Sequence, residues 1–214
     1  MKLKNFKREN MIPLPVTLIS TASKDGIRNI APYSCVVTIL RPTNLVCIAS
    51  AMMRDTFVNI EETGEFVINM ISTDMVDKVI PTSSHVAFDI DEYDLANLEA
   101  TQSKEINAPG IKGAYSKIEC KLRKIYKDKD PIGIPYLLII GEVVNLEVED
   151  DCLDKKFGVL DLNKVKPLMM LESDKGMHFC TIEDIDKFET FGAMFPDGKD
   201  PLEWMYEGED YEDW

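Results

Sequence analysis

A short stretch near residue 50 combines residue types that bind anions. Ser50 and Ala51 follow an apolar run at residues 45–49, and Arg54 precedes a helix start that Asp55 or Thr56 can cap. A helix start exposes unpaired backbone N–H groups at its positive dipole end, and an arginine adds a guanidinium. This chemistry suits a phosphate. A plain strand–helix–strand connection with a surface arginine is the alternative, and the residue types alone leave both open.

The neighbouring elements must hold this stretch in place. Gly64 favours the left-handed conformation that ends helices, so a short helix is expected to stop there. A buried strand is predicted at residues 66–71, immediately after it. The anion-binding residues therefore lie where one strand ends and a helix begins.

The first fifty residues predict a meandering antiparallel sheet or barrel. Four short β-type runs occupy residues 16–49, and the Asp25-Gly26 pair between the first two is typical of a hairpin turn. Pro32 cannot donate a backbone hydrogen bond, so a bend or a sheet edge is expected there. Two long strands at residues 114–126 and 136–148 are predicted to pair. Gly141 within the second indicates a bulge or a close approach of another backbone.

The remaining segments predict short helices and a distinct tail. Residues 74–80 form a short amphipathic pattern that Pro81 closes, and residues 82–107 read as short helices and loops over the sheet. Thr181 and Asp184 have the spacing of a helix cap, which predicts a helix at residues 181–188. The expected domain spans residues 1–188, followed by an acidic, aromatic extension at 189–214. This extension is either solvated or docked on a partner subunit or over a pocket.

Composition excludes several classes of protein. The chain has 214 residues, a net charge of −14, 45% hydrophobic residues and 29% charged residues, which is typical of a globular protein. The negative charge argues against nucleic acid and anionic membranes as partners. No membrane-spanning run or signal peptide is evident, and five widely spaced cysteines without a C-x-x-C pair favour a reduced, cytoplasmic protein. His85 and His178, the two histidines, lie on separate segments, so structural or surface roles are favoured over metal ligation.

Familiar catalytic and nucleotide-binding motifs are missing from the sequence. There is no G-x-G-x-x-G pattern, no G-x-x-x-x-G-K-[ST] and no G-x-S-x-G. A Rossmann domain, a P-loop and a serine-hydrolase elbow are therefore not supported.

An ordered set of short motifs carries a resemblance to a known family. The set within residues 15–69 comprises Ile19-Ser20-Thr21, Asp25-Gly26, residues 29–34 (Asn-Ile-Ala-Pro-Tyr-Ser), Arg54-Asp55-Thr56, Asn59-Ile60 and residues 63–69 (Thr-Gly-Glu-Phe-Val-Ile-Asn). Further matches lie at residues 109–112, 140–144, 160–162 and 166–168. Over about residues 10–172 the chain resembles the flavin reductase-like family. The resemblance implies a mainly β fold with peripheral helices, the FMN-binding split β-barrel.

The resemblance also implies a cofactor site. In this family the FMN phosphate lies at the strand end and helix start that correspond to residues 50–56, and the segment matching residues 29–34 runs along the flavin. The implied FMN-binding residues are Asn29, Ala31, Pro32, Tyr33, Ser34, Ser50, Ala51, Met52, Arg54 and Thr56. Asn29 as a plain turn residue and Tyr33 as a core residue are the structural alternatives.

The implied function is that of a flavin reductase or a flavoredoxin-like electron carrier. The flavin takes a hydride from NADH or NADPH, so no catalytic side chain and no metal are expected. A homodimer is implied, and the electron acceptor is left open. A non-catalytic FMN-binding protein and a split-barrel oxidase acting on a small molecule are the alternatives. The sequence departs from the family at residues 173–180, where His178 or Phe179 stands in place of a tyrosine close to the flavin.

Overall fold

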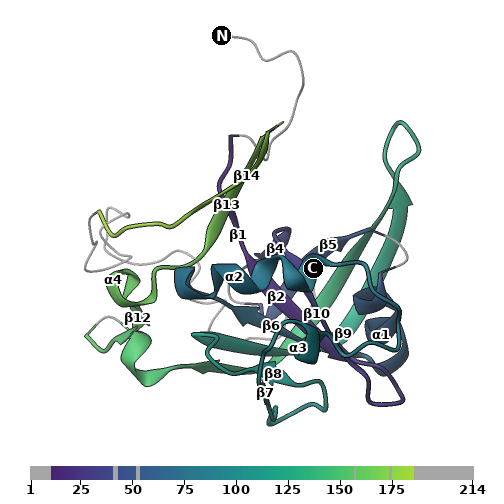
Figure 1. Cartoon of the computed structure of the whole chain (residues 1–214), viewed down its shortest axis with the longest axis horizontal. Helices are drawn as coiled ribbons and strands as arrows, with labels where there is room; N and C mark the ends of the chain where they lie inside the picture. Colours follow the sequence, from purple (N-terminus) through teal and green to yellow (C-terminus); the bar gives the residue numbers. More distant parts are fainter. Residues whose placement is uncertain (1–10, 41–42, 52–53, 157, 174, 186–214) are drawn as a thin grey trace, which may run out of the picture.

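A seven-stranded antiparallel sheet forms the body of the protein. The computed structural model describes residues 11–40, 43–51, 54–156, 158–173 and 175–185 (Figure 1). The strands follow the spatial order β3-β2-β6-β9-β10-β5-β4. Their bounds are β2 Thr17–Ala22, β3 Arg28–Tyr33, β4 Val36–Thr38, β5 Leu45–Ser50, β6 Glu65–Met70, β9 Ser116–Lys129 and β10 Pro135–Val148. The mainly β class expected from the sequence is confirmed.

Shorter elements surround this sheet. Within the described residues, three small sheets are made by β1 Leu14–Pro15 with β13 Met169–Ser173 and β14 Gly176–Cys180, by β7 Ala100–Thr101 with β8 Gly110–Ile111, and by β11 Leu153–Asp154 with β12 Val159–Leu160. The α-helices are α1 Asp55–Thr63, α2 Val76–Val79, α3 Glu92–Leu95 and α4 Leu162–Val165. The 3-10 turns are η2 Thr73–Met75, η3 Pro81–Ser83 and η4 Asp150–Cys152. In Figure 1 the β13–β14 pair and the far end of β9–β10 both project from the body.

The strand order differs from a simple meander. Strands β2 and β3 form the hairpin predicted around Asp25-Gly26, with Thr17 opposite Tyr33. Strands β3 and β4 follow each other in the chain but occupy opposite edges of the sheet. Pro32 therefore lies on an edge strand, as predicted, where its missing N–H breaks no ladder. The two long strands also pair as predicted.

One predicted helix is wrong over its described part. Residues 181–185 contain no helix. Thr181 does not cap one, because its Oγ1 donates a hydrogen bond of 2.9 Å to the carbonyl oxygen of Pro167. A tertiary contact that fixes the chain beside β13 thus replaces the capping hydrogen bond that the local pattern predicts. The rest of the predicted helix, the extension at 189–214 and Met52 lie outside the described residues.

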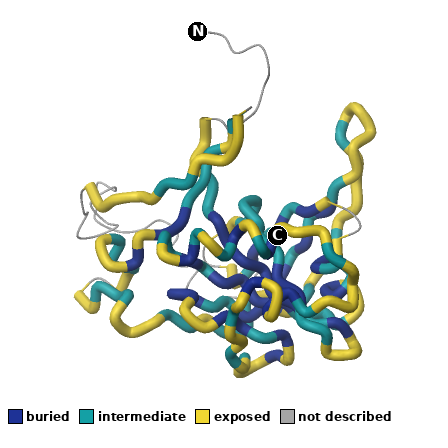
Figure 2. The backbone as a smooth tube through the Cα atoms, in the orientation of Figure 1, coloured by how far each residue is buried: buried dark blue, intermediate teal, exposed yellow. Residues whose placement is uncertain are grey.

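The main sheet is buried on both faces in its central part. Leu18 and Ile19 are adjacent on β2 and fully buried, yet they belong to different clusters because alternate side chains point to opposite faces. Leu18 packs with Tyr93 of α3, whereas Ile19 packs with Phe57 of α1. Figure 2 shows this buried centre in dark blue. The two hydrophobic clusters pack on opposite faces of the sheet at β2 and β3 and so hold the first hairpin in place.

Gly141 allows a phenylalanine ring to lie against β10. A Cβ atom built on Gly141 would overlap Cζ of Phe66 and lie 3.0 Å from its Cε1. Phe66 is fully buried and cannot move into solvent. The pairing of β9 with β10 shifts register between Ile140 and Gly141. The predicted irregularity at Gly141 is confirmed, and the partner that comes close is a side chain.

Replacing Gly141 with alanine is therefore expected to destabilise the fold. Overpacking a filled core costs roughly 1–3 kcal/mol, which urea unfolding followed by circular dichroism would measure. The same alanine in a Phe66→Leu background should cost less, because the ring it meets is gone. Equal costs in the two backgrounds would show that the ring does not set the requirement for glycine.

Candidate functional site

The predicted site residues gather around one cleft of about 410 Å³. It lies between the ends of β3 and β5, the start of α1, the segment of residues 82–86 and Glu92. Every residue of the implied FMN-binding set that the structure describes lines it, namely Asn29, Ala31, Pro32, Tyr33, Ser34, Ser50, Ala51, Arg54 and Thr56. Residues that are separate in the sequence thus share one concave surface, and its volume is in the range of small-molecule sites.

The curl of the sheet brings the two strand ends together. The hydroxyl oxygens of Tyr33 and Ser50 lie 3.1 Å apart, which links the end of β3 to the end of β5. The N–H of Ala49 donates to the carbonyl oxygen of Cys35 at 2.9 Å, just beyond β3. Tyr33 is half-buried at this contact and also packs against the core around Ile19. The cleft is therefore a product of sheet curvature.

Helix α1 points an uncapped N-terminus at the cleft. Its N-cap is Arg54, and no side chain makes a capping hydrogen bond. The expectation that Asp55 or Thr56 caps the helix is wrong, because both lie inside it. The first bond of the helix runs from the N–H of Val58 to the carbonyl oxygen of Arg54 at 3.1 Å, so the N–H groups of residues 55–57 have no partner within the helix. At its other end Gly64 takes the predicted left-handed conformation, with φ of 74°.

Arg54 stands next to a histidine that the sequence reading did not connect with the site. Its Nη1 atom lies 3.4 Å from both ring nitrogens of His85. Among the described residues, no ion pair involves Arg54. A guanidinium with no carboxylate partner at a helix N-terminus provides a site for an anion. His85 lies on a segment without a periodic pattern, so only the fold brings it to Arg54.

Asn29 is the centre of a buried polar network beside the cleft. It lies on β3, so it is not a turn residue. Its Oδ1 accepts hydrogen bonds from Thr21 Oγ1 at 3.2 Å and from Thr56 Oγ1 at 3.1 Å. Thr21 in turn accepts from Asn59 Nδ2 at 3.0 Å. The Thr56 hydroxyl is therefore committed to Asn29 and holds α1 against β3.

Glu92 lines the cleft, and the sequence patterns did not predict it there. Its Oε2 accepts hydrogen bonds from Asn29 Nδ2 and, at 2.7 Å, from the backbone N–H of Ile30. The residue is only 6% exposed, and it lines the cleft. The pKa of Glu92 is raised to about 7, mainly by burial; the hydrogen bond from Ile30 opposes the shift, and the charges of Asp55 and Asp91 add to it. A lone glutamate in an acidic segment carries no sequence signal for this role.

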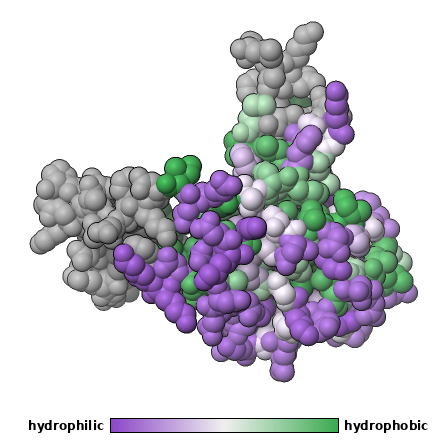
Figure 3. All heavy atoms as spheres, turned by 60° about the vertical axis from the view of Figure 1, so that its left-hand side comes forward, coloured by the Kyte–Doolittle hydropathy of each residue, from purple (hydrophilic) through white to green (hydrophobic). Residues whose placement is uncertain are grey.

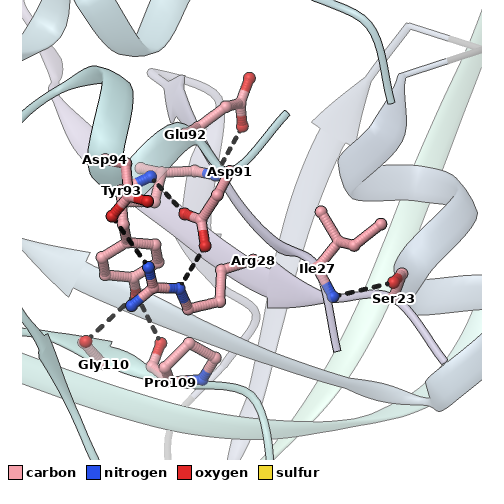
Figure 4. Close-up of polar contacts among 10 residues, drawn as sticks. Ser23, Ile27, Arg28, Asp91, Glu92, Tyr93, Asp94, Pro109 and Gly110 are labelled. Carbon is pink, nitrogen blue, oxygen red and sulfur yellow. Dashed lines mark hydrogen bonds and ion pairs between the residues drawn. The ribbon is translucent and has the colours of Figure 1, made fainter. Parts of the chain in front are cut away.

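A clamp centred on Arg28 fixes the short helix that carries Glu92 (Figure 4). Arg28 Nε contacts Asp91 Oδ2 at 2.6 Å, and its Nη2 contacts Asp94 Oδ1 at 3.1 Å. The guanidinium also lies 4.9 Å from the centre of the Tyr93 ring. Tyr93 donates from its hydroxyl to the Pro109 carbonyl at 3.0 Å. A four-residue helix is thereby held on the main sheet.

The other predicted contributors lie elsewhere. His178 and Phe179 are on β14 and do not line the cleft; His178 Nε2 lies 3.2 Å from Ser173 Oγ.

Among the described residues, no group of three or more His, Cys, Asp or Glu side chains could hold a metal ion. No helix in the described part of the chain is long and apolar enough to cross a membrane. Hydrophilic residues cover much of the face drawn in Figure 3.

Comparison with known proteins agrees with this arrangement. An uncharacterized protein of Methanothermobacter thermautotrophicus is 65% identical over 207 residues, which covers 97% of each chain. The flavoredoxin of Desulfovibrio vulgaris superposes with a TM-score of 0.75 at 21% identity, over 93% of this chain and 100% of that one. A putative flavin reductase with a split barrel domain from Shewanella frigidimarina gives a TM-score of 0.74 at 22% identity, over 85% and 88%. The split-barrel fold is thus confirmed.

The family is shown by the sequence match. The flavin reductase like domain matches residues 8–175, which is most of the chain and includes every residue that lines the cleft. The curled sheet, the cleft at its strand ends and this match lead to one conclusion: the chain belongs to the flavin reductase-like domain family.

Proposed function

We propose that the protein is an FMN-binding oxidoreductase that takes electrons from NADH or NADPH and passes them to an acceptor. The single observation that supports it most is the uncapped start of α1 beside Arg54, which has no ion-pair partner among the described residues. When bound, FMN would supply the hydride-accepting chemistry. The protein's part is to bind, orient and partly cover it.

The lining residues suit the two ends of such a ligand. Arg54, His85 and the N–H groups of residues 55–57 would hold the phosphate, since they combine charge, hydrogen-bond donors and the helix dipole. Residues 31–34, at and just beyond the end of edge strand β3, are half-buried and would line the ring system. Pro32 stiffens that wall. Met52, outside the described residues, remains a proposed contact on the strength of the resemblance alone.

Two other functions remain as competing proposals. A non-catalytic protein would bind FMN in the same cleft without reacting with a nicotinamide. An oxidase acting on a small phosphorylated molecule would need a second anion site. The acidic chain, with its net charge of −14, makes such a second site less favourable.

We also propose that the protein is a homodimer. Strand β4 is an edge of the main sheet, and Val37, Ile39 and Leu40 on or beside it are 60%, 44% and 59% exposed. At the projecting turn of β9–β10, Ile132 is 81% exposed. An open strand edge with apolar neighbours favours burial against another chain, and a second copy is the partner that the family resemblance implies.

The first prediction tests the phosphate contact. Arg54→Ala is expected to weaken FMN binding by roughly 1.5–3 kcal/mol, or about ten- to hundredfold, because a charge-assisted hydrogen bond is lost. Fluorescence titration would measure this, and riboflavin, which lacks the phosphate, should bind the variant and the parent equally. Arg123→Ala, which removes an exposed arginine paired with Glu142, is the matched control and should change neither affinity. Equal weakening of riboflavin would instead assign Arg54 a structural role.

A second prediction separates a reductase from a passive flavin carrier. Under anaerobic conditions, NADH or NADPH added to the FMN-loaded protein should bleach the visible absorbance of the oxidised flavin. A stopped-flow spectrophotometer would give the rate for each nucleotide. Bound FMN that stays oxidised with both nucleotides would contradict the reductase proposal and favour the non-catalytic one.

A third prediction concerns the dimer. Light scattering after gel filtration should give about twice the monomer mass of 24.3 kDa. Val37→Asp places a charge on the proposed interface and should shift the mass toward the monomer, whereas Val159→Asp, on the distant β12, should not. A monomeric parent protein would overturn the proposal.

A further inference from the structure

One carboxyl group lines the cleft with an oxygen to which no described residue is hydrogen-bonded. Both hydrogen bonds to Glu92 fall on Oε2, which accepts from Asn29 and from the Ile30 N–H. Figure 4 shows the other carboxyl oxygen pointing away from Arg28, Asp91 and Tyr93. A proton on this carboxyl therefore belongs on Oε1, because Oε2 already receives two donors. A protonated Oε1 is a hydrogen-bond donor.

Glu92 also lies next to the anion-binding end of the cleft. Asn29 contacts Glu92 through its amide nitrogen and Thr56 of the first turn of α1 through its amide oxygen. Only one side chain thus separates the carboxyl group from the uncapped helix start. A negative charge on Glu92 would repel a phosphate there, whereas a neutral Glu92 would help to bind it.

We propose that Glu92 is a ligand-binding residue that donates a hydrogen bond from protonated Oε1 to a phosphate-bearing ligand, so that binding of this ligand takes up a proton. This inference rests on the proposed FMN site and deepens it. The proton comes from solvent and stays on Oε1 while the ligand is bound. No covalent bond forms or breaks.

The surrounding charges agree with this assignment. Asp55 of α1 and Asp91 at the start of α3 are the acidic groups that act on Glu92. The cationic Arg28 is occupied by Asp91 and Asp94 and makes no bond to Glu92. Arg54, His85 and the Tyr33 hydroxyl face the same cleft, but no hydrogen bond or ion pair joins any of them to Glu92 in the described part of the chain.

The direction of the pH effect follows from linkage. Burial holds the pKa of Glu92 near 7 before a ligand binds, so the group loses its proton as pH rises through that value. A bound phosphate raises this pKa further, because its negative charge disfavours the carboxylate. Affinity for FMN should therefore fall with rising pH above 7, with a limit of about tenfold per pH unit for one proton.

The experiment compares the full-length protein with Glu92→Gln. Gln has nearly the same shape and keeps an acceptor for the Ile30 N–H, but it cannot titrate. From pH 7.0 to 8.5 the FMN dissociation constant of the parent should rise about four- to eightfold, and that of Glu92→Gln less than about twofold. The phosphate monoester itself, with a pKa of about 6, changes little in this range and affects both proteins equally. Titration calorimetry in two buffers of different ionisation enthalpy should detect proton uptake for the parent only.

Two controls make the result specific. Asp55→Asn removes a negative charge from the same cleft and should strengthen FMN binding. The fall of affinity with rising pH should persist in this variant and begin at a lower pH, because Asp55 is one of the charges that raise the pKa of Glu92. Riboflavin should bind the parent with little pH dependence, because it lacks the phosphate. Circular dichroism and urea unfolding would establish that each variant is folded.

The outcomes separate this inference from the function on which it rests. Parallel pH slopes for the parent and Glu92→Gln, or an equal slope with riboflavin, would overturn the role of Glu92 and leave FMN binding intact. If the parent fails to bind FMN even at pH 6.5, the proposed function and this inference fall together.

Discussion

The buried amide of Asn29 is the contact on which the site depends. Its oxygen accepts from Thr21 and Thr56, and its nitrogen donates to Glu92, so one side chain joins β2, β3, α1 and α3. A buried polar group is costly unless all of its bonds are made, and this amide has partners on both atoms. The walls of the cleft are therefore fixed relative to one another. A carboxamide supplies donors and an acceptor at once, which no apolar or purely acidic side chain in its place would do.

Basic side chains face the cleft although the chain as a whole is acidic. The protein carries a net charge of −14, yet Arg54 and His85 face the cleft at an uncapped helix start. The acidic residues that line the cleft are Asp55 and Glu92. Burial keeps the pKa of Glu92 near 7, so much of the expected repulsion is absent at or below neutral pH. Burial of one carboxyl group would thus make the proposed anion site compatible with an acidic protein.

Sequence patterns predicted the regular elements well, because those elements depend on local signals. Alternation of apolar and polar residues predicted the two long strands, the Asp25-Gly26 pair predicted the first hairpin, and Gly64 predicted the end of α1. The prediction was wrong where a tertiary contact outweighed a local one. Thr181 bonds to Pro167 and no helix forms in residues 181–185, and Arg54 is the N-cap of α1 in place of Asp55 or Thr56. Capping patterns are short and common, so tertiary packing easily prevents the helix ends that they predict.

By itself, the sequence determined the mainly β class, the family and the residues of β3, β5 and α1 that line the cleft, since these lie in ordered local motifs. Only the tertiary structure decided that β3 and β4 occupy opposite edges of the sheet and that its curl brings Tyr33 to Ser50. The tertiary structure also decided that His85 lies beside Arg54 and that Glu92 accepts a hydrogen bond from Asn29. The physical reason is that these three side-chain contacts join residues 17, 31 and 63 positions apart in the sequence, where no local pattern constrains the partner.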